Sequence, residues 1–248
     1  MKLSSPLIRA VELQKGLNDE ARLTISVEPG TITCVIGPDS EGISCWLRIM
    51  AGLEFFVDGR LELLGRDWRE MDRESWQQSR QKIGYISADS ALHSVQNIMD
   101  NIITPAYYHK LGTWEHLKEK AQGLLKQAGY TDQASLSLLP AYVAPEKRYL
   151  AMLVRALMLE PQVLFFDNLF GKIGVMAKND VYKLLMERVR QSGMSIVFNT
   201  RNLDFVSQYA DALLFVCCSK VLKFDDFQQF QNSDDSAVTE YKKQYAMR

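Results

Sequence analysis

The sequence predicts an α/β protein with a mostly parallel core sheet, an antiparallel β region at its N-terminus and an inserted helical subdomain. Strand-like apolar runs alternate with helix-like runs between residues 163 and 217, which is typical of a parallel sheet covered by helices. The segment 94–129 carries apolar residues at helical spacing and has no strand signal. Residues 8–27 alternate apolar and polar side chains around a break at Gly16, as two short antiparallel strands do.

The remaining elements follow in chain order. Gly52 can end the first helix, because glycine adopts the left-handed backbone at a helix end, and Pro161 separates an apolar helix from a buried strand that ends in Asp167. The expected strands after residue 27 are 31–36, 60–64, 82–86, 163–166, 195–199 and 212–217. The other expected helices are 44–51, a charged helix ending near Gln81, and 149–159, 175–191 and 203–210.

These elements predict three parts of the chain. Residues 1–87 and 158–223 form the α/β core, residues 88–157 form the helical subdomain, and residues 224–248 form a C-terminal appendage. We expect the appendage to pack Phe227 and Phe230 on the body of the protein. The alternative is that it makes a regulatory or dimer contact.

Composition excludes several classes of protein. A chain of 248 residues that is 47% hydrophobic can bury a sizeable core, and its net charge of -1 gives no electrostatic basis for a nucleic-acid partner. The four cysteines lack metal-ligand or disulfide spacing, so we expect buried, reduced thiols. No apolar leader and no run of roughly 18 apolar residues is present, which predicts a cytoplasmic protein. Any role at a membrane would then require a membrane partner.

A loop with two spaced glycines lies between the strand 31–36 and the helix 44–51. Compared with the phosphate-binding pattern G-x-x-x-x-G-K-[ST], Gly37 and Gly42 stand at the glycine positions and Ser44 follows, but Ile43 replaces the lysine. The glycines let backbone N–H groups converge on phosphate, and the lysine offsets the phosphate charge. The loop therefore has the spacing for phosphate without the cation. The alternative is an unrelated turn with the same spacing.

Several landmarks between residues 8 and 225 occur in an order that resembles the ATPase subunits of ABC transporters. They are residues 27–30 before the loop, 50–54 after its helix, 83–85 before the Q-loop position, 155–157 and 160–161, the strand 164–167, and 209–211. The resemblance implies a P-loop NTPase fold of the ABC-ATPase type. Residues 138–146 and 97–105 are most similar to the ATPase subunits of bacterial MCE-type lipid transporters.

The resemblance fails at the positions that bind or hydrolyse ATP in that family. No Phe, Tyr or Trp precedes Trp46, so the aromatic residue that stacks on adenine has no counterpart. Pro145 removes a backbone donor from the signature motif, and an amide such as Asn168 cannot take a proton as the catalytic glutamate does. The aligned departures are Ala88 at the Q-loop glutamine, Val143–Lys147 at the signature motif, Asn168 at the catalytic base, Gly174 at the D-loop aspartate and Arg201 at the switch histidine.

A vestigial cofactor-binding site remains, made of Gly37, Gly42, Ser44 and Asp167. By the resemblance, Asp167 keeps the position that orients Mg²⁺. Each residue also has a structural role, because glycines make turns, serine caps helices and aspartate bonds to nearby backbone. The sequence therefore predicts no catalytic residue and no metal ligand, and it does not lead us to expect bound ATP or Mg²⁺.

These departures lead to the hypothesis of a pseudo-ATPase. It would be a catalytically inactive subunit that docks on an integral membrane permease, at the inner face of the cell membrane, as a structural or regulatory part of a lipid transporter. One alternative is a weak ATP-binding or ATPase subunit in which Lys147, Lys172 or Arg201 supplies the positive charge. Another alternative is a soluble scaffold protein without a permease.

The resemblance also implies the partners. A permease would dock in the cleft around Ala88–His109, where Tyr107, Tyr108 and His109 either line the surface or pack as ordinary aromatic residues. ABC ATPases form dimers, so we expect a homodimer or a heterodimer with another ABC ATPase. Both composite nucleotide sites of such a heterodimer would be impaired.

Overall fold

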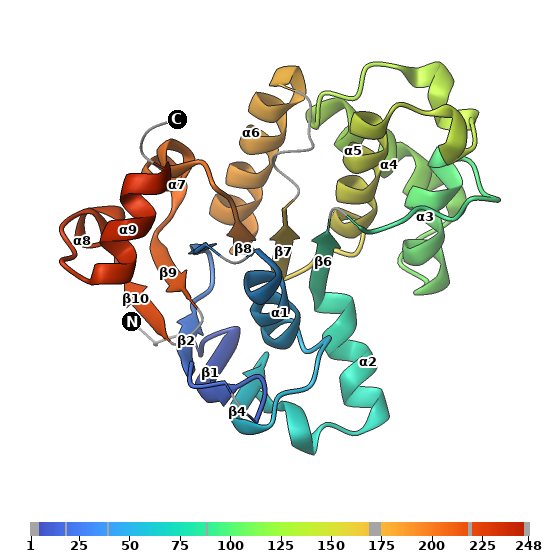
Figure 1. Cartoon of the computed structure of the whole chain (residues 1–248). Coiled ribbons are helices and arrows are strands. Elements are labelled where there is room, and N and C mark those ends of the chain that lie inside the picture. The colour runs from blue at the N-terminus through green and yellow to red at the C-terminus, as the bar shows by residue number, and fades with distance from the viewer. Residues whose placement is uncertain are drawn as a thin grey trace.

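The computed structural model of the chain describes residues 5–17, 19–38, 40–87, 89–168, 175–217 and 220–245. The chain contains a four-stranded sheet and a six-stranded sheet, and helices lie next to both edges of the larger one (Figure 1). Helices α3 (Ile98–Tyr108), α4 (Trp114–Gln127) and α5 (Pro145–Leu157) lie beyond β6 (Ile83–Ser87) (Figure 1). Helices α8 (Phe227–Gln231) and α9 (Ser236–Tyr245) lie beyond β9 (Ala212–Val216) (Figure 1). Among the residues described here, no helix combines the length and apolar character that a bilayer crossing requires.

The smaller sheet forms as the alternation in residues 8–27 predicts. Its strands are β1 (Ile8–Gln14), β2 (Leu23–Val27), β4 (Asp58–Leu63) and β5 (Arg66–Asp67), in the order β2-β1-β4-β5. All neighbouring pairs are antiparallel. In β2 the side chains alternate strictly between buried and exposed, because one face of the sheet packs on the core and the other meets solvent.

The larger sheet is the predicted core and has the order β10-β9-β3-β8-β7-β6. Its strands are β3 (Ile32–Ile36), β6 (Ile83–Ser87), β7 (Val163–Asp167), β8 (Ser195–Asn199), β9 (Ala212–Val216) and β10 (Val221–Phe224). All pairs are parallel except β9 with β10, which is antiparallel. Every residue of β3, β7 and β8 is buried, because both faces of the sheet are covered.

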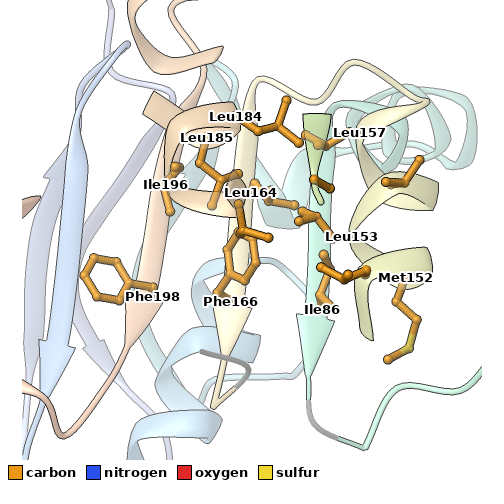
Figure 2. Packing of buried hydrophobic residues seen from close by; sticks show 14 of the residues in the cluster. Ile86, Met152, Leu153, Leu157, Leu164, Phe166, Leu184, Leu185, Ile196 and Phe198 are labelled. Atoms are coloured by element: carbon orange, nitrogen blue, oxygen red, sulfur yellow. The ribbon is translucent and has the colours of Figure 1, made fainter. Parts of the chain in front are cut away.

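Each face of the core sheet has its own hydrophobic cluster. Figure 2 shows Ile86, Leu164, Phe166, Ile196 and Phe198 on one face, packed against Met152, Leu153 and Leu157 of α5 (Pro145–Leu157) and Leu184 and Leu185 of α6 (Val175–Ser192). The opposite face packs Val163, Phe165 and Val197 against α1 (Ser40–Met50) and the smaller sheet. Side chains alternate along each strand, so neighbouring residues such as Phe165 and Phe166 serve different clusters.

The helical subdomain consists of α3 (Ile98–Tyr108), α4 (Trp114–Gln127) and α5, and short 3-10 turns at 133–137 and 140–142 connect α4 to α5. The predicted helical stretch is broken after α3, and Thr113 begins α4 by accepting a hydrogen bond from the backbone N–H of His116. Between β5 and β6 lie a 3-10 turn at 68–70 and α2 (Arg73–Lys82), and α7 (Leu203–Tyr209) precedes β9.

Two details of the sequence prediction are wrong. The first helix begins at Ser40 and not at Ser44, so the glycine-spaced loop is shorter than the pattern implies. Strand β10 was not expected, and it adds an antiparallel edge to the core sheet. Helices α8 (Phe227–Gln231) and α9 (Ser236–Tyr245) follow it, and Phe230 is fully buried against Phe215 and Phe224. The division into three parts with the stated boundaries stays a prediction.

Candidate functional site

The candidate site lies where the carboxyl ends of β6, β7 and β8 meet the first half of α1. Parallel pairing places Asp167 beside Ser87 of β6, and Asn199 follows Phe198, which pairs with Phe166 of β7. Asp167 and Asn199 each lie two residues after a side chain that packs on the α1 face of the sheet. Three strand ends therefore deliver polar side chains to one point beside α1.

Asp167 is the centre of this site, and it is only 5% exposed. Its Oδ1 accepts hydrogen bonds from the Ser44 hydroxyl at 2.7 Å and from the Asn199 side-chain amide at 2.9 Å. Its Oδ2 accepts a hydrogen bond from the Tyr85 hydroxyl at 2.7 Å. A carboxylate offers about four lone-pair sites, so this chain itself occupies most of the acceptor capacity of Asp167.

Tyr85 reaches Asp167 diagonally from the neighbouring strand. Its ring packs on Phe165 with centroids 6.1 Å apart, and this contact directs the hydroxyl along the strand toward Asp167. Burial, and then the hydrogen bond to the Asp167 carboxylate, raise the pKa of Tyr85 well above its ordinary value. Tyr85 therefore stays protonated and donates to Asp167 throughout the neutral range.

Asn199 connects Asp167 to the residue that follows it. While its amide donates to Asp167, its side-chain oxygen accepts a hydrogen bond from the backbone N–H of Asn168. Asn168 has a φ of 56°, in the left-handed region that asparagine tolerates better than most residues. Asn168 therefore fits a strained turn at the end of β7, and its exposed side chain faces the adjacent pocket.

The glycine-spaced loop is held in place by close packing against β9 and the hydrophobic cluster on the α1 face. A Cβ added to Gly37 would lie 1.9 Å from the backbone oxygen of Val216, so only glycine allows this approach to β9. Ile43 is 4% exposed and packs within the cluster on the α1 face, and its Cδ1 would lie 3.5 Å from the same added Cβ. Gly42 is buried within the first turns of α1. The position of the pattern's lysine is thus part of the hydrophobic core.

A pocket of about 550 Å³ opens beside Asp167 and is lined by Ser44, Arg48, Tyr85, Ser87, Asp89, Asp167 and Asn168. Arg48 is the cation among these lining residues, and its guanidinium forms a 2.6 Å ion pair with Glu54. Two aspartates line the same space. The lining therefore carries more negative than positive charge, which disfavours a polyphosphate.

The structure brings together two of the four predicted site residues, Ser44 and Asp167, through a direct hydrogen bond. Gly37 and Gly42 lie in the loop and the first turns of α1, where their roles are packing roles. Tyr85, Asn199 and Arg48 were not predicted. The sequence feature that could have indicated Tyr85 and Asn199 is that the strands β6 and β8 carry polar residues near their carboxyl ends, as the strand ending at Asp167 does.

The other aligned positions are partly described. Pro145 begins α5, and the Lys147 ammonium pairs with Asp132 within the helical subdomain. Arg201 is exposed, just before α7. Ala88, Lys172 and Gly174 lie outside the described residues. Of the cysteines, Cys34 is a buried free thiol, Cys45 and Cys217 are half-buried free thiols, and Cys218 lies outside the described residues.

Comparison with known proteins adds sequence relatives. A profile of the family described as "ABC transporter" matches residues 21–171. The methionine import ATP-binding protein MetN of Rhizobium johnstonii is 25% identical over 223 residues, which cover 89% of this chain and 61% of MetN. The arginine transport ATP-binding protein ArgV of Corynebacterium glutamicum is 25% identical over 222 residues, covering 86% of this chain and 84% of ArgV. This chain spans about three fifths of the length of MetN.

Solved structures show the same fold. An ATP-binding subunit of an ABC transporter superposes with a TM-score of 0.80 at 19% identity, covering 97% of this chain and 99% of that one. The dimeric ATP-binding cassette MJ0796, in a post-hydrolysis state bound to ADP and Pi, superposes with a TM-score of 0.78 at 16% identity, covering 88% and 98%. The profile match covers more than half of this chain, and the two-sheet architecture with its helical subdomain agrees with it. The chain belongs to the ABC transporter family and has its ATP-binding cassette fold.

Proposed function

We propose that this chain is a cassette subunit that does not hydrolyse ATP and that acts as a structural or regulatory part of an ABC transporter. The observation that carries the proposal is the carboxylate of Asp167. Its oxygens already accept hydrogen bonds from Ser44, Tyr85 and Asn199. Mg²⁺ requires near-ideal octahedral geometry, and a carboxylate held by three protein donors is a poor ligand or anchor for its waters.

The loop supports the same proposal. Because α1 already begins at Ser40, fewer backbone N–H groups point freely into the space where a phosphate would lie. Ile43 is buried in the core and brings no charge. Two unit charges 4 Å apart interact by about 4 kcal/mol at an effective dielectric constant of 20, so losing a lysine and facing Asp167 both weaken phosphate binding substantially.

Asn168 supports the absence of ATP hydrolysis whether or not a nucleotide binds. Its amide cannot act as the base that a phosphoryl-transfer site uses to position or activate water. It also holds the left-handed turn after β7, which is a structural reason for asparagine there. We therefore expect no chemical step even where some nucleotide binds.

The test is phosphate release and nucleotide titration with the purified full chain and Mg²⁺. We expect the wild-type chain to release no more phosphate than the Asp167→Asn and Ser44→Ala variants, whose release defines the background. Release that both substitutions abolish would overturn the proposal. Titration with ATP in the same samples separates weak binding from hydrolysis.

A second candidate is a weak ATP-binding subunit with a rewired site. It is favoured by the relatives, whose names describe ATP-binding proteins, and by the open pocket beside Ser44 and Arg48. Lys147, which was considered from sequence, pairs with Asp132 and does not line the pocket. Arg48 does line the pocket and is the better-placed source of charge, although Glu54 also pairs with it. Saturable ATP binding that Arg48→Gln and Ser44→Ala both weaken would favour this candidate.

The proposed partner is an integral membrane permease, with this chain peripheral at the inner face of the cell membrane. Support comes from exposed apolar side chains on the helical subdomain, which water alone does not favour. They include Val95 at 87%, Tyr108 at 77% and Tyr142 at 75% exposure. A groove of about 410 Å³ between residues 90–94 and the start of α5 lies in the same part of the chain.

Co-purification from membranes tests this partner. We expect Tyr108→Ser to lower recovery of the permease, because the exposed ring would lose its contact. The matched control is Leu17→Ser, since Leu17 is 86% exposed but lies next to β1, far along the chain from the helical subdomain. Equal recovery with both variants would argue against this surface, and no accompanying membrane protein would favour a soluble scaffold.

We also propose a class of transported substrate and an oligomeric state. The relatives named above are described as methionine import and arginine transport proteins, which favours import of a small solute. The lipid-transport proposal rests on residues 97–105 and 138–146 and gains no support from these names. MJ0796 is described as dimeric, so we propose a homodimer or a heterodimer with another ABC ATPase. Identification of the co-purified permease decides between the two cargo classes.

A further inference from the structure

A second pocket, of about 400 Å³, lies at the C-terminal end of α1. The Arg48–Glu54 ion pair separates it from the pocket at Asp167, because Arg48 lines one pocket and Glu54 lines the other. The segment 52–55, the 3-10 turn at 68–70 and α2 surround it, and α2 lies at the amino end of β6 (Figure 1). Its volume is in the range of pockets that bind small molecules.

Three aromatic rings form its walls. The rings of Phe55 and Trp68 have centroids 5.5 Å apart at 81°, and those of Trp68 and Trp76 are 6.4 Å apart at 88°. The Trp76 ring packs closely on Gly52, since a Cβ added there would lie 2.7 Å from its Cη2. Edge-to-face rings at this spacing are in contact, so the three rings form one continuous apolar wall on which a flat group can lie.

The pocket also carries one uncompensated positive charge. The Arg80 guanidinium lies over the Trp76 ring at 5.7 Å, and no carboxylate of the described residues lies within 4 Å of it. Glu54 lines the pocket too, but its charge is compensated by Arg48. Arg80 is exposed, so its guanidinium can be reached from solvent, and partial desolvation against the pocket lowers its pKa from its ordinary value.

We propose that this pocket binds a small planar aromatic anion, with its ring system lying against the wall of Phe55, Trp68 and Trp76 and its carboxylate paired with Arg80. A cationic ligand would face Arg80 without a free carboxylate. A neutral aromatic ligand would leave the guanidinium unpaired, whereas an anion gains a charge-assisted hydrogen bond. The inference does not depend on whether the chain hydrolyses ATP.

The test uses three probes that share one ring system: indole-3-acetate, neutral indole-3-acetamide and cationic tryptamine. The chain contains four tryptophans, and the indole N–H signals of Trp68 and Trp76 in a ¹H–¹⁵N spectrum report on the pocket. Trp46 and Trp114 lie outside its lining and are internal controls. We expect shifts confined to Trp68 and Trp76, and at least about tenfold tighter binding of the acetate than of the acetamide.

The variants assign the preference to Arg80. We expect Arg80→Gln to weaken acetate binding about tenfold and to leave acetamide binding unchanged. Arg73→Gln is the matched control, because Arg73 is an exposed arginine of the same helix outside the lining. Phe55→Ala should weaken both probes equally. Equal binding of the three probes, shifts at all four tryptophans, or no shift at millimolar probe would overturn the proposal.

Discussion

The two pockets on either side of the Arg48–Glu54 pair differ in how their charged groups are satisfied. At the ends of β6, β7 and β8, the carboxylate of Asp167 is buried and accepts three hydrogen bonds from its own chain. At the end of α1, the guanidinium of Arg80 has an aromatic neighbour but no carboxylate partner within the described chain. A group already satisfied by its own fold contributes to stability, whereas an unpaired one is available to a ligand. We therefore expect substitutions at the first pocket to lower stability and those at the second to leave it nearly unchanged.

Gly37→Ala should have the largest effect. The added Cβ would lie 1.9 Å from the backbone oxygen of Val216, so β9 or the loop must move, at a cost of about 3 kcal/mol in the free energy of unfolding. Gly123→Ala is the matched control, because nothing lies within 4 Å of its added Cβ and alanine favours a helix interior by up to about 1 kcal/mol. Urea unfolding of both variants measures the difference. A Gly37→Ala protein as stable as the wild type would mean that this glycine has no packing role.

Asp167→Asn should come next, with a loss of about 2 to 3 kcal/mol. The amide keeps one acceptor oxygen and replaces the other with an N–H₂ group, so either Tyr85 or the pair Ser44 and Asn199 loses its acceptor, and the charge that strengthens all three hydrogen bonds is lost. Asp89→Asn is the control, because Asp89 lines the same pocket but is exposed. Thermal and urea unfolding provide the measurement. If Asp167→Asn proved neutral or stabilising, Asp167 would be a strained functional carboxylate and the second candidate function would gain support.

Tyr85→Phe should cost about 1.5 kcal/mol near neutral pH, the lower end for a hydrogen bond to a charged group, since the adjacent pocket lets water replace the hydroxyl. The folded-state pKa of Tyr85 is raised, so its contribution is fully present below the unfolded-state pKa of about 10 and is lost as the pH rises above it. The wild type should therefore lose more free energy of unfolding than Tyr85→Phe between about pH 9 and 11. Parallel pH profiles for the two proteins would show that Tyr85 does not donate to Asp167.

The sequence allowed most of the core sheet to be predicted, because continuous apolar runs such as those of β7 and β8 occur only where both faces are covered. The start of α1 was placed four residues late, since the lysine-containing pattern assumes a longer loop. Ser and Glu, the residues at 40 and 41, are favoured in a first helical turn and begin the helix there.

Within the site, Ser44 and Asp167 could be predicted because both belong to a local motif. Tyr85 and Asn199 could not be predicted, because they lie 82 and 32 positions from Asp167 along the chain and their contacts with it depend on the register of three strands. The aromatic pocket joins the end of α1 to α2 in the same nonlocal way. Local patterns identified the strand ends, and only the pairing of the strands determined which side chains meet.

Phe55→Ala should change the free energy of unfolding least of these variants, and it tests directly whether the aromatic pocket contributes less to stability than the pocket at Asp167. Phe55 is 80% exposed, so its truncation removes little buried surface, and we expect a change within about 0.5 kcal/mol in the free energy of unfolding. Phe56, its neighbour, is 6% exposed and packs in the cluster on the α1 face, so Phe56→Ala is the matched control and should cost about 3 kcal/mol. Urea unfolding compares the two variants directly. A cost for Phe55→Ala close to that of Phe56→Ala would mean that the aromatic wall is part of the hydrophobic core. The pockets at Asp167 and at Arg80 would then not differ in their contribution to stability.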